Sequence, residues 1–476
     1  MPRTILDEKP LDERRIEDKN VSLLLDQRAR PERGPLATWT RSYAMTLTLL
    51  RSTLEQNKSS LWRARLITDK AAVPIPLKIS LQKIYIPRRK DVLPEGMSAK
   101  DATGVLKAEW VDYHPHTDQH LPAERVILYV HGGAYFICSR KTHRGITYRV
   151  AKYAHARVLA IDYRLSPEST FPTPLNDVLS AYLFLIDPPP HTGAPRYHPS
   201  QVTFMGDSAG AALAVSTVLW LRDHKPSIPM PGALALISPW LDLTHSMPSW
   251  RLNNGYDYLP DGLTDRKYVT PTRSHVYVTD NSQLSHPLVS PMFAREHPHR
   301  PLPPTLIHAG DAEKLRDEII NFTERSFPSS PIQLELYEDQ PHVFHMLAPL
   351  DPMGKCALKR MGSWTKDIMS RYTAHDTEVT IPHTVTRVLN RPTNPVIPIT
   401  DPLAIIDEAR EILRERGKWV DDVKGGHPRA SSASDEARRV MERDPAMAVD
   451  KEIVEKLGEL AVLGPALKRA ALAGGK

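Results

Sequence analysis

The hydrophobic and polar positions in the middle of the chain alternate between two kinds of pattern. Short runs of apolar and β-branched residues, typical of buried strands, are each followed by a segment with apolar residues at helical spacing. The expected strands are 125–130, 158–163, 201–205, 233–237, 304–308 and 332–337. The expected helices are 141–154, 175–186, 211–221 and 313–326. Strands that alternate with helices pair in parallel, so the pattern predicts an α/β protein with a doubly wound sheet.

The segments before and beside this alternation follow other patterns. Residues 1–35 are charged and poor in aromatic residues, which predicts a mobile N-terminal segment. Residues 36–75 carry apolar side chains at helical spacing and predict one or two amphipathic helices. Residues 78–87 and 106–113 predict two neighbouring strands. Residues 242–285 break the alternation with aromatic residues and prolines, which predicts a partly helical insertion over the edge of the sheet.

The composition changes again beyond residue 375. Residues 376–400 are rich in Thr, Pro and Val, and 424–437 has the composition of a linker. Residues 402–418 and 448–474 predict two amphipathic helices. We therefore expect an N-terminal segment, a main domain and a C-terminal extension, with the boundaries 1–35, 36–375 and 376–476.

Composition and charge exclude several classes of protein. The chain has 476 residues, of which 41% are hydrophobic and 25% charged, so it can bury a sizeable core. The net charge of +6 is dispersed among 56 acidic residues, so we predict no nucleic-acid partner. Two cysteines, Cys138 and Cys356, are too few for a disulfide framework and favour a reducing compartment.

The N-terminal residues lack the apolar core of a signal peptide. No run of the sequence approaches the ~18 apolar residues that a transmembrane helix needs. The sequence therefore predicts a cytoplasmic protein without a transmembrane segment.

The most informative stretch is Gly206-Asp207-Ser208-Ala209-Gly210, which joins the expected strand 201–205 to the expected helix 211–221. A Gly-x-Ser-x-Gly pentapeptide between a strand and a helix is typical of a nucleophile elbow, a tight turn that exposes the serine hydroxyl at the carboxyl edge of a sheet. Small residues before and after the serine relieve the crowding in such a turn. Ser208 is therefore the candidate nucleophile.

A serine nucleophile needs hydrogen-bond donors for the oxyanion that develops on the attacked carbonyl. The stretch His131-Gly132-Gly133-Ala134-Tyr135 directly follows the expected strand 125–130, so it leaves the sheet at the same edge as the elbow. Its two glycines allow the backbone to approach a substrate oxygen closely. We predict an oxyanion hole made by the N–H groups of Gly132, Gly133 and Ala209.

The serine also needs a base to take its proton. His342 follows the expected strand 332–337, which places it at the carboxyl end of a strand. His345, three residues further on, is the alternative, but we expect it to begin the next helix. His342 is therefore the candidate base.

The acid that orients the base lies in the stretch 309–318, where four carboxylates compete. We expect Asp317 and Glu318 to lie in the following helix, where acidic residues are common because of the helix dipole. The residues themselves leave Asp311 and Glu313 as alternatives.

Residues 105–350 resemble the hormone-sensitive-lipase-like branch of the α/β-hydrolases, which contains carboxylesterases and lipases with an HGG oxyanion motif. Four motifs carry the resemblance in order, and His342-Val343-Phe344 closes the set. They are His131-Gly132-Gly133-Ala134-Tyr135, Asp162-Tyr163-Arg164-Leu165-Ser166-Pro167-Glu168, Gly206-Asp207-Ser208-Ala209-Gly210 and Ser238-Pro239-Trp240-Leu241-Asp242-Leu243. The order serine, acid, histidine along the chain also fits this fold.

The chain departs from the family pattern at two positions. Ala134 stands where the family commonly has the third glycine of HGGG. The family's acid motif, Asp-x-Leu-x-Asp-Glu, aligns with Leu315, Asp317 and Glu318, which puts Glu313 at the position of the aspartate. Glutamate occurs as the acid in α/β-hydrolases, so the resemblance favours Glu313 over Asp311.

The resemblance also implies how the rest of the chain contributes. Residues 36–75 and part of 242–285 would form a cap over an acyl pocket lined by Tyr135, Phe136 and Trp240. The segment 163–165 and Glu168 would brace the oxyanion loop. The reaction requires no metal and no cofactor.

We predict a serine carboxylic-ester hydrolase that acts on a hydrophobic small-molecule ester. Amide hydrolysis and acyl transfer use the same residues and stay open as alternatives, as does a catalytically silent binding protein of the same fold. The apolar helix faces of 376–476 permit contact with a membrane surface as well as packing on the main domain. The sequence specifies neither the substrate nor the oligomeric state.

Overall fold

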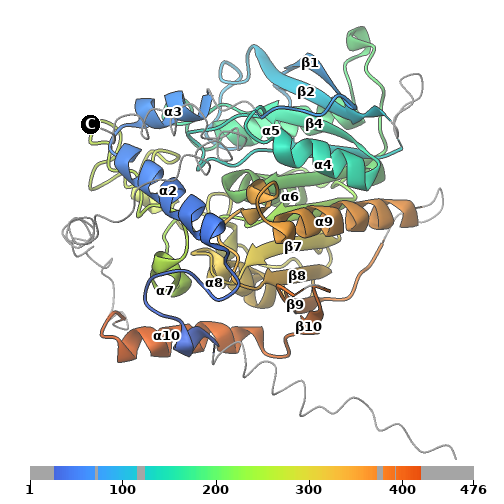
Figure 1. Ribbon diagram of the computed structural model, residues 1–476. Coiled ribbons are helices and arrows are strands. Elements are labelled where there is room, and N and C mark those ends of the chain that lie inside the picture. Colours follow the sequence, from blue (N-terminus) through green and yellow to red (C-terminus); the bar gives the residue numbers. More distant parts are fainter. Residues whose placement is uncertain (1–25, 70–72, 115–123, 373–378, 392, 420–476) are drawn as a thin grey trace, which may run out of the picture.

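A ten-stranded sheet forms the centre of the part of the chain that the computed structural model describes (Figure 1). That part is the whole chain except residues 1–25, 70–72, 115–123, 373–378, 392 and 420–476. The strand order is β1-β2-β4-β3-β5-β6-β7-β8-β9-β10. The strands are β1 (Ile79–Pro87), β2 (Val105–Tyr113), β3 (Val126–Val130), β4 (Arg157–Asp162), β5 (Val202–Asp207), β6 (Ala233–Ile237), β7 (Thr305–Gly310), β8 (Ile332–Tyr337), β9 (Thr384–Val388) and β10 (Val396–Pro398).

The sheet is parallel in its centre and antiparallel at both edges. The seven strands from β4 to β9 in this order pair in parallel, whereas β1, β2 and β10 pair with their neighbours in antiparallel fashion. The central strands β3, β5 and β6 are buried at every position, as expected for strands covered on both faces. The predicted α/β class with a doubly wound sheet is confirmed.

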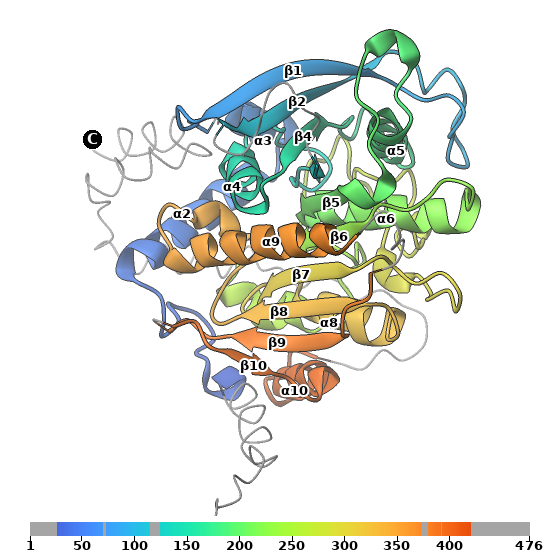
Figure 2. The ribbon, with the colours of Figure 1, turned by 90° about the vertical axis from the view of Figure 1, so that its right-hand side faces the viewer.

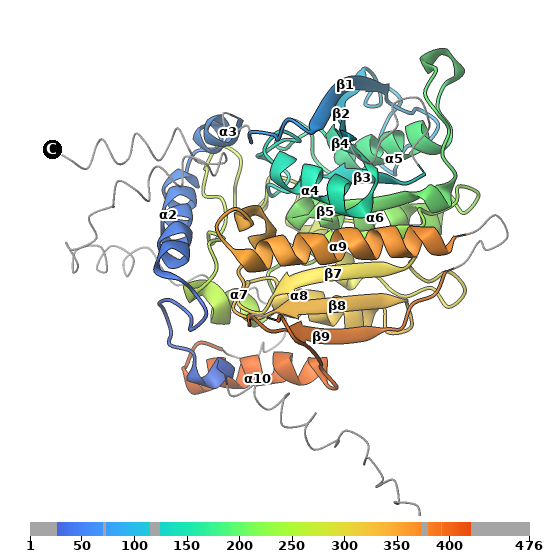
Figure 3. The same ribbon diagram turned by 45° about the vertical axis from the view of Figure 1, so that its right-hand side comes forward.

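Helices cover both faces of the sheet. The labelled helices are α2 (Arg41–Asn57), α3 (Leu61–Asp69), α4 (Arg144–Ala154), α5 (Thr173–Ile186), α6 (Ser208–His224), α7 (Ser249–Leu252), α8 (Arg316–Asn321), α9 (Pro352–Arg371) and α10 (Pro402–Glu415). The helices α4 and α9 pack against each other on the face that is nearer in Figure 2. The helices α5 and α6 pack against each other on the opposite face. Figure 3 shows α2 and α3 beyond the ends of the strands.

Several helices and strands differ from those that the hydrophobic pattern predicted. The twenty-residue helix α9 was not expected, and the helix expected at 313–326 is α8 followed by a π-helical turn, Phe322–Ser326. Strands β9 and β10 lie beyond residue 375, in the segment that we expected to be an extension, and they continue the sheet. The helix expected at 402–418 is α10, which packs on α7 and α8. The helix expected at 448–474 lies outside the described residues.

The described residues contain no helix that combines the length and the apolar character needed to cross a membrane.

The turn between β5 and α6 packs directly on the backbone that follows β3. A Cβ atom added to Gly210 would lie 2.2 Å from the carbonyl oxygen of Val130 and 2.3 Å from that of His131. A Cβ atom added to Gly206 would lie 2.6 Å from the same Val130 oxygen. Glycine at both positions therefore allows the elbow to contact the strand end backbone to backbone.

We expect Gly210→Ala to destabilise the protein by at least about 2 kcal/mol, because the new methyl group has no room and the backbone must move. Gly145→Ala in α4 is the matched control, since the nearest heavy atoms to its added Cβ lie at 3.7 Å, an ordinary contact distance. Alanine is the better helix former by up to about 1 kcal/mol, so the control should be neutral or stabilising. Thermal unfolding of both variants measures the difference, and equal stability of the two would contradict the packing argument.

Candidate active site

Ser208 is the first residue of α6 and follows β5 directly, at the carboxyl edge of the parallel strands. Its φ of 53° lies in the left-handed region, which a serine adopts at a cost in free energy. The hydroxyl oxygen Oγ lies 2.9 Å from Nε2 of His342, at hydrogen-bond distance. The structure therefore places the expected nucleophile in the strained turn that exposes it, with an imidazole in contact.

His342 lies in the loop after β8 and is buried. The alternative base, His345, is also buried, but its Nε2 lies 3.1 Å from Nδ1 of His308, in a separate contact. Of the two histidines, the structure brings His342 and not His345 to the serine.

Glu313 lies behind the imidazole of His342, after the end of β7. Its Oε2 is 3.9 Å from Nδ1 of His342 and accepts a hydrogen bond of 2.6 Å from the hydroxyl of Ser238. The other carboxylate oxygen of Glu313 and Nδ1 of His342 are both buried, with no other partner among the described residues. The two groups therefore face each other slightly beyond hydrogen-bond distance, at 3.9 Å.

Asp311, the alternative acid, has other partners. Its carboxylate pairs with Arg30 at 2.9 Å and with Arg387 of β9 at 3.0 Å, and it accepts the N–H of Asp339 at 2.7 Å. The carboxylate is fully buried, so the two arginines balance its charge inside the protein. Asp311 is thus part of a buried network of ion pairs.

The loop after β3 contains three successive residues with positive φ: Gly133, Ala134 and Tyr135 at 111°, 52° and 67°. Gly132 precedes them, and its N–H donates to Oδ1 of Asp207 at 3.0 Å. Gly132 therefore does not present its N–H to a substrate oxygen, which disagrees with the role we predicted for it. Gly133 and Ala134 border the cavity above Ser208, whereas Gly132 does not.

Ser208 and His342 line a cavity of about 610 Å³ whose wall is mostly apolar. Both segments expected to form a cap contribute side chains to it. They include Leu50, Leu54 and Ile67 from α2 and α3, and Leu259 and Leu263 from the segment after α7. Phe136 and Trp240 line the cavity as predicted. The prediction for Tyr135 is wrong, because its ring is buried and stacks on Tyr277 with centroids 3.7 Å apart.

Comparisons with known proteins identify the family to which this fold belongs. The model of a family with the α/β hydrolase fold matches residues 127–346. An acetyl-hydrolase of Streptomyces hygroscopicus is 34% identical over 267 residues, which are 55% of this chain and 80% of that protein. The chain belongs to the α/β-hydrolase family.

Two further similarities concern this α/β hydrolase. An esterase of Acinetobacter venetianus is 32% identical over 237 residues, which are 50% of this chain and 73% of that protein. The crystal structure of an esterase from the bacterial hormone-sensitive lipase family superposes with a TM-score of 0.50 and 27% identity, covering 74% of this chain and 97% of that one. The resemblance to hormone-sensitive-lipase-like esterases is confirmed.

The loop after β3, where we expected the oxyanion hole, is braced from two sides. The hydroxyl of Tyr163 donates to the carbonyl oxygen of His131 at 3.0 Å. On the cap side, Arg65 of α3 donates to the carbonyl oxygen of Phe136 at 2.7 Å and pairs with Glu168 at 2.6 Å. Of the residues expected to brace the loop, 163–165 and Glu168, Tyr163 thus contacts it directly and Glu168 contacts it through one arginine.

Burial shifts the pKa values of the candidate base and the candidate acid in opposite directions. It lowers the pKa of His342, and the nearby carboxylates of Asp257 and Asp207 oppose this shift. It raises the pKa of Glu313 well above its usual range, where the hydroxyl of Ser238 opposes the shift and the charge of Asp257 adds to it. The imidazole is therefore neutral near pH 7 and able to accept a proton.

Asp257 is a residue of the site that the sequence did not reveal. Its buried carboxylate accepts the N–H of Lys314 at 2.7 Å and the N–H of His342 at 3.4 Å. Its carbonyl oxygen accepts Nε of Arg51 in α2 at 2.7 Å. It thus joins the cap helix to the loops of the acid and the base. No motif marks it within 242–285.

Ser238 was quoted in a family motif but given no role. Its hydroxyl donates to Glu313 and accepts the N–H of Val343 at 3.1 Å. Because Val343 follows the base directly, Ser238 holds the acid and the base loop together. Its position in the motif could have indicated that Ser238 belongs to the site.

Cys138 also borders the cavity, close to the oxyanion loop. Burial raises the pKa of its thiol to about 12, so the thiol stays protonated and is a poor nucleophile near pH 7. This agrees with a packing role. Among the described residues, no group of three or more His, Cys, Asp or Glu side chains could hold a metal ion.

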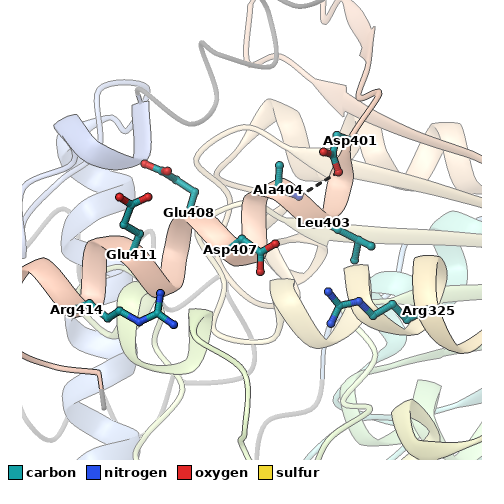
Figure 4. A pocket seen from close by; sticks show the side chains of 8 residues that line it. All are labelled: Arg325, Asp401, Leu403, Ala404, Asp407, Glu408, Glu411 and Arg414. Atoms are coloured by element: carbon teal, nitrogen blue, oxygen red, sulfur yellow. Dashed lines mark hydrogen bonds between the residues drawn. The ribbon is translucent and has the colours of Figure 1, made fainter. Parts of the chain in front are cut away.

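A second, open cavity of about 790 Å³ lies along α10 (Figure 4). Its lining side chains are Arg325, Asp401, Leu403, Ala404, Asp407, Glu408, Glu411 and Arg414. None of these lining residues is a serine, cysteine or histidine, so this cavity lacks the serine–histidine pair found in the first.

Proposed function

We propose that Ser208, His342 and Glu313 form the catalytic triad of a serine carboxylic-ester hydrolase that cleaves a hydrophobic ester. The observation that carries this proposal is the 2.9 Å contact between Oγ of Ser208 and Nε2 of His342 at the wall of an apolar cavity. The relatives named esterase and acetyl-hydrolase support the ester-hydrolase class.

In the proposed reaction each group has one step. Nε2 of His342 takes the proton of Ser208 while Oγ attacks the ester carbonyl, and the imidazolium then gives this proton to the leaving alcohol. Water repeats the cycle on the acyl-enzyme, with His342 again as the base. An apolar wall favours the hydrocarbon part of the ester.

Glu313 acts on the transition state more than on the resting enzyme. Its charge is disfavoured by burial while His342 is neutral, and it becomes favourable when the imidazolium forms 3.9 Å away. An interaction that strengthens as charge develops lowers the barrier of the reaction. Glu313 is therefore competent in the role for which the family usually has aspartate.

We propose that Gly133, Ala134 and Ala209 supply the backbone N–H donors of the oxyanion hole. Gly133 and Ala134 border the cavity, and Ala209 stands in the first turn of α6, where the positive end of the helix dipole favours an oxyanion. Gly132 is left out because Asp207 accepts its N–H. The change of Gly to Ala at 134 keeps the donor.

The alternatives differ in how well the site supports them. A catalytically silent binding protein has no need of a serine hydroxyl in contact with a buried imidazole, so the geometry argues against it. Amide hydrolysis and acyl transfer use the same residues, and no contact in the cavity favours either over ester hydrolysis.

We expect a fluorophosphonate probe to label the wild-type protein and to leave Ser208→Ala unlabelled. The same substitution should lower the rate of p-nitrophenyl butyrate hydrolysis by at least ~10⁴-fold, because the nucleophile is lost. Ser216→Ala, also on α6, is the matched control, because its hydroxyl bonds only within the helix, and it should be labelled normally. An unlabelled wild-type protein would overturn the proposal.

We expect Glu313→Gln to lower kcat by roughly 10³–10⁴-fold, because the amide cannot balance the charge of the imidazolium. Asp311→Asn should instead lower the unfolding temperature, since it leaves two buried arginines with less compensation, and keep kcat within a few-fold. Both kcat values are measured per site titrated with the fluorophosphonate. If Asp311→Asn lost kcat at unchanged stability, the acid would be Asp311.

We expect Asp257→Asn to move the acid limb of the pH profile of kcat/KM to lower pH by roughly half to one pH unit. The base must be neutral, so activity falls as pH falls through the pKa of the His342–Glu313 pair. Removing the charge of Asp257 lowers the pKa of both members. Asp207, Tyr258 and His345 also face the imidazole and are unchanged.

Asp261→Asn is the control for this pH profile, because its carboxylate is partly exposed and pairs with Lys314 rather than contacting the base loop. Its acid limb should move less than that of Asp257→Asn. An acid limb that stays in place or rises in Asp257→Asn would contradict the electrostatic role of Asp257.

A further inference from the structure

We propose that His275 is a fixed hydrogen-bond donor in the apolar wall of the substrate cavity, and that it selects esters whose hydrocarbon part carries a second oxygen acceptor. A carbonyl or ether oxygen remote from the scissile ester would serve. This inference rests on the proposed function of the same cavity and specifies its substrate class.

Aromatic neighbours hold the ring of His275 in one orientation. The side chain lines the cavity and is only 9% exposed. Trp240 packs against it at right angles, with centroids 5.1 Å apart and an interplanar angle of 87°. Tyr135 and Phe136 contact the ring at centroid distances of 6.4 and 6.3 Å. The direction of its polar atoms is therefore set before a substrate arrives.

The hydrogen bond within the segment determines which nitrogen of His275 carries the proton. Nδ1 accepts the N–H of Tyr277 at 3.2 Å, so Nδ1 has no hydrogen of its own. Burial, with a contribution from the charge of Arg273, lowers the pKa of the ring to about 3, which keeps it neutral near pH 7. A neutral imidazole with an accepting Nδ1 carries its hydrogen on Nε2.

The Nε2–H group of His275 has no acceptor among the described residues. Nε2 is also not one of the buried side-chain nitrogens that lack both a hydrogen-bond partner and contact with open space. Because His275 lines the cavity and this N–H has no acceptor among the described residues, a ligand in the cavity is the acceptor that the proposal gives it. His275 thus differs from its polar neighbours Ser274 and Asn281, whose side chains bond to each other at 2.8 Å.

His245, the other histidine near Trp240, does not offer the same site. Its ring lies between Trp240 and Trp250, stacked at centroid distances of 5.5 and 3.5 Å. Its Nε2 is buried against protein atoms without a partner. His245 therefore contributes the surface of its ring to the aromatic wall, and His275 is the donor.

The consequence is selectivity between substrates of similar shape. A hydrocarbon chain that covers the Nε2–H group removes it from water without replacing its hydrogen bond, which costs free energy. A chain with an oxygen at that point restores the bond. The preference requires an oxygen at one position of the chain only, because the donor is fixed.

The test compares p-nitrophenyl octanoate with its keto analogues, in which one carbonyl replaces one methylene at successive positions of the acyl chain. A second series, octyl acetate and keto-octyl acetates, moves the carbonyl along the alcohol chain. The ratio of kcat/KM for keto and plain ester is measured in the wild type, in His275→Phe and in His275→Gln. The ratio cancels general losses of activity, and thermal unfolding verifies that each variant is folded.

At one carbonyl position the ratio in the wild type should exceed that in His275→Phe by about tenfold, the effect of one hydrogen bond to a buried donor. His275→Gln, which keeps an N–H donor, should retain part of the preference. Equal ratios in the wild type and His275→Phe at every position of both series would overturn the inference while leaving the hydrolase intact. If the wild type hydrolysed no ester, the proposed function would fail as well.

Discussion

The backbone contact between the elbow and the end of β3 is the constraint on which the active site depends. Gly206 and Gly210 bring α6 so close to Val130 and His131 that no Cβ atom fits between them. This contact places the nucleophile beside the oxyanion loop, because that loop begins at His131. Asp207 then reinforces the contact, since it precedes Ser208 and accepts the N–H of Gly132. The proposed nucleophile and the proposed oxyanion hole are thus two parts of one packing arrangement.

The second organising feature is that the buried carboxylates at this edge of the sheet have different partners. Two arginines balance Asp311. Asp257 accepts hydrogen bonds from backbone N–H groups. Asp207 accepts hydrogen bonds from a backbone N–H and a tyrosine hydroxyl and contacts a histidine ring nitrogen. Glu313 alone of these four has a hydroxyl and an unpartnered imidazole nitrogen as its neighbours. A positive charge that forms on His342 is therefore best compensated by Glu313, which is a physical reason for the acid independent of motif register.

The sequence was sufficient to predict the features that depend only on residues close together in the chain. The strand-elbow-helix around Ser208 and the position of His342 after β8 follow from apolar runs and short motifs, which the local chain determines. The roles predicted for Gly132 and Tyr135 were not supported, because they depend on the dihedral angles of a loop with three positive φ values. Asp257 and strand β9 could not be predicted, since their partners lie far away in the chain and hydrophobic periodicity carries no information on distant pairing.

Strand β9 shows why the described residues that follow position 378 belong with the hydrolase domain. Its Arg387 pairs with Asp311, in the same loop as the proposed acid, and Arg30 binds that carboxylate from the other end of the chain. Without Arg387, a buried carboxylate two residues from Glu313 would lose half of its compensation, and unpaired buried charges are costly. Arg30 and Arg387 therefore hold the loop of the proposed acid from both sides in sequence, and the shape of the proposed triad depends on residues outside the segment that carries the family motifs.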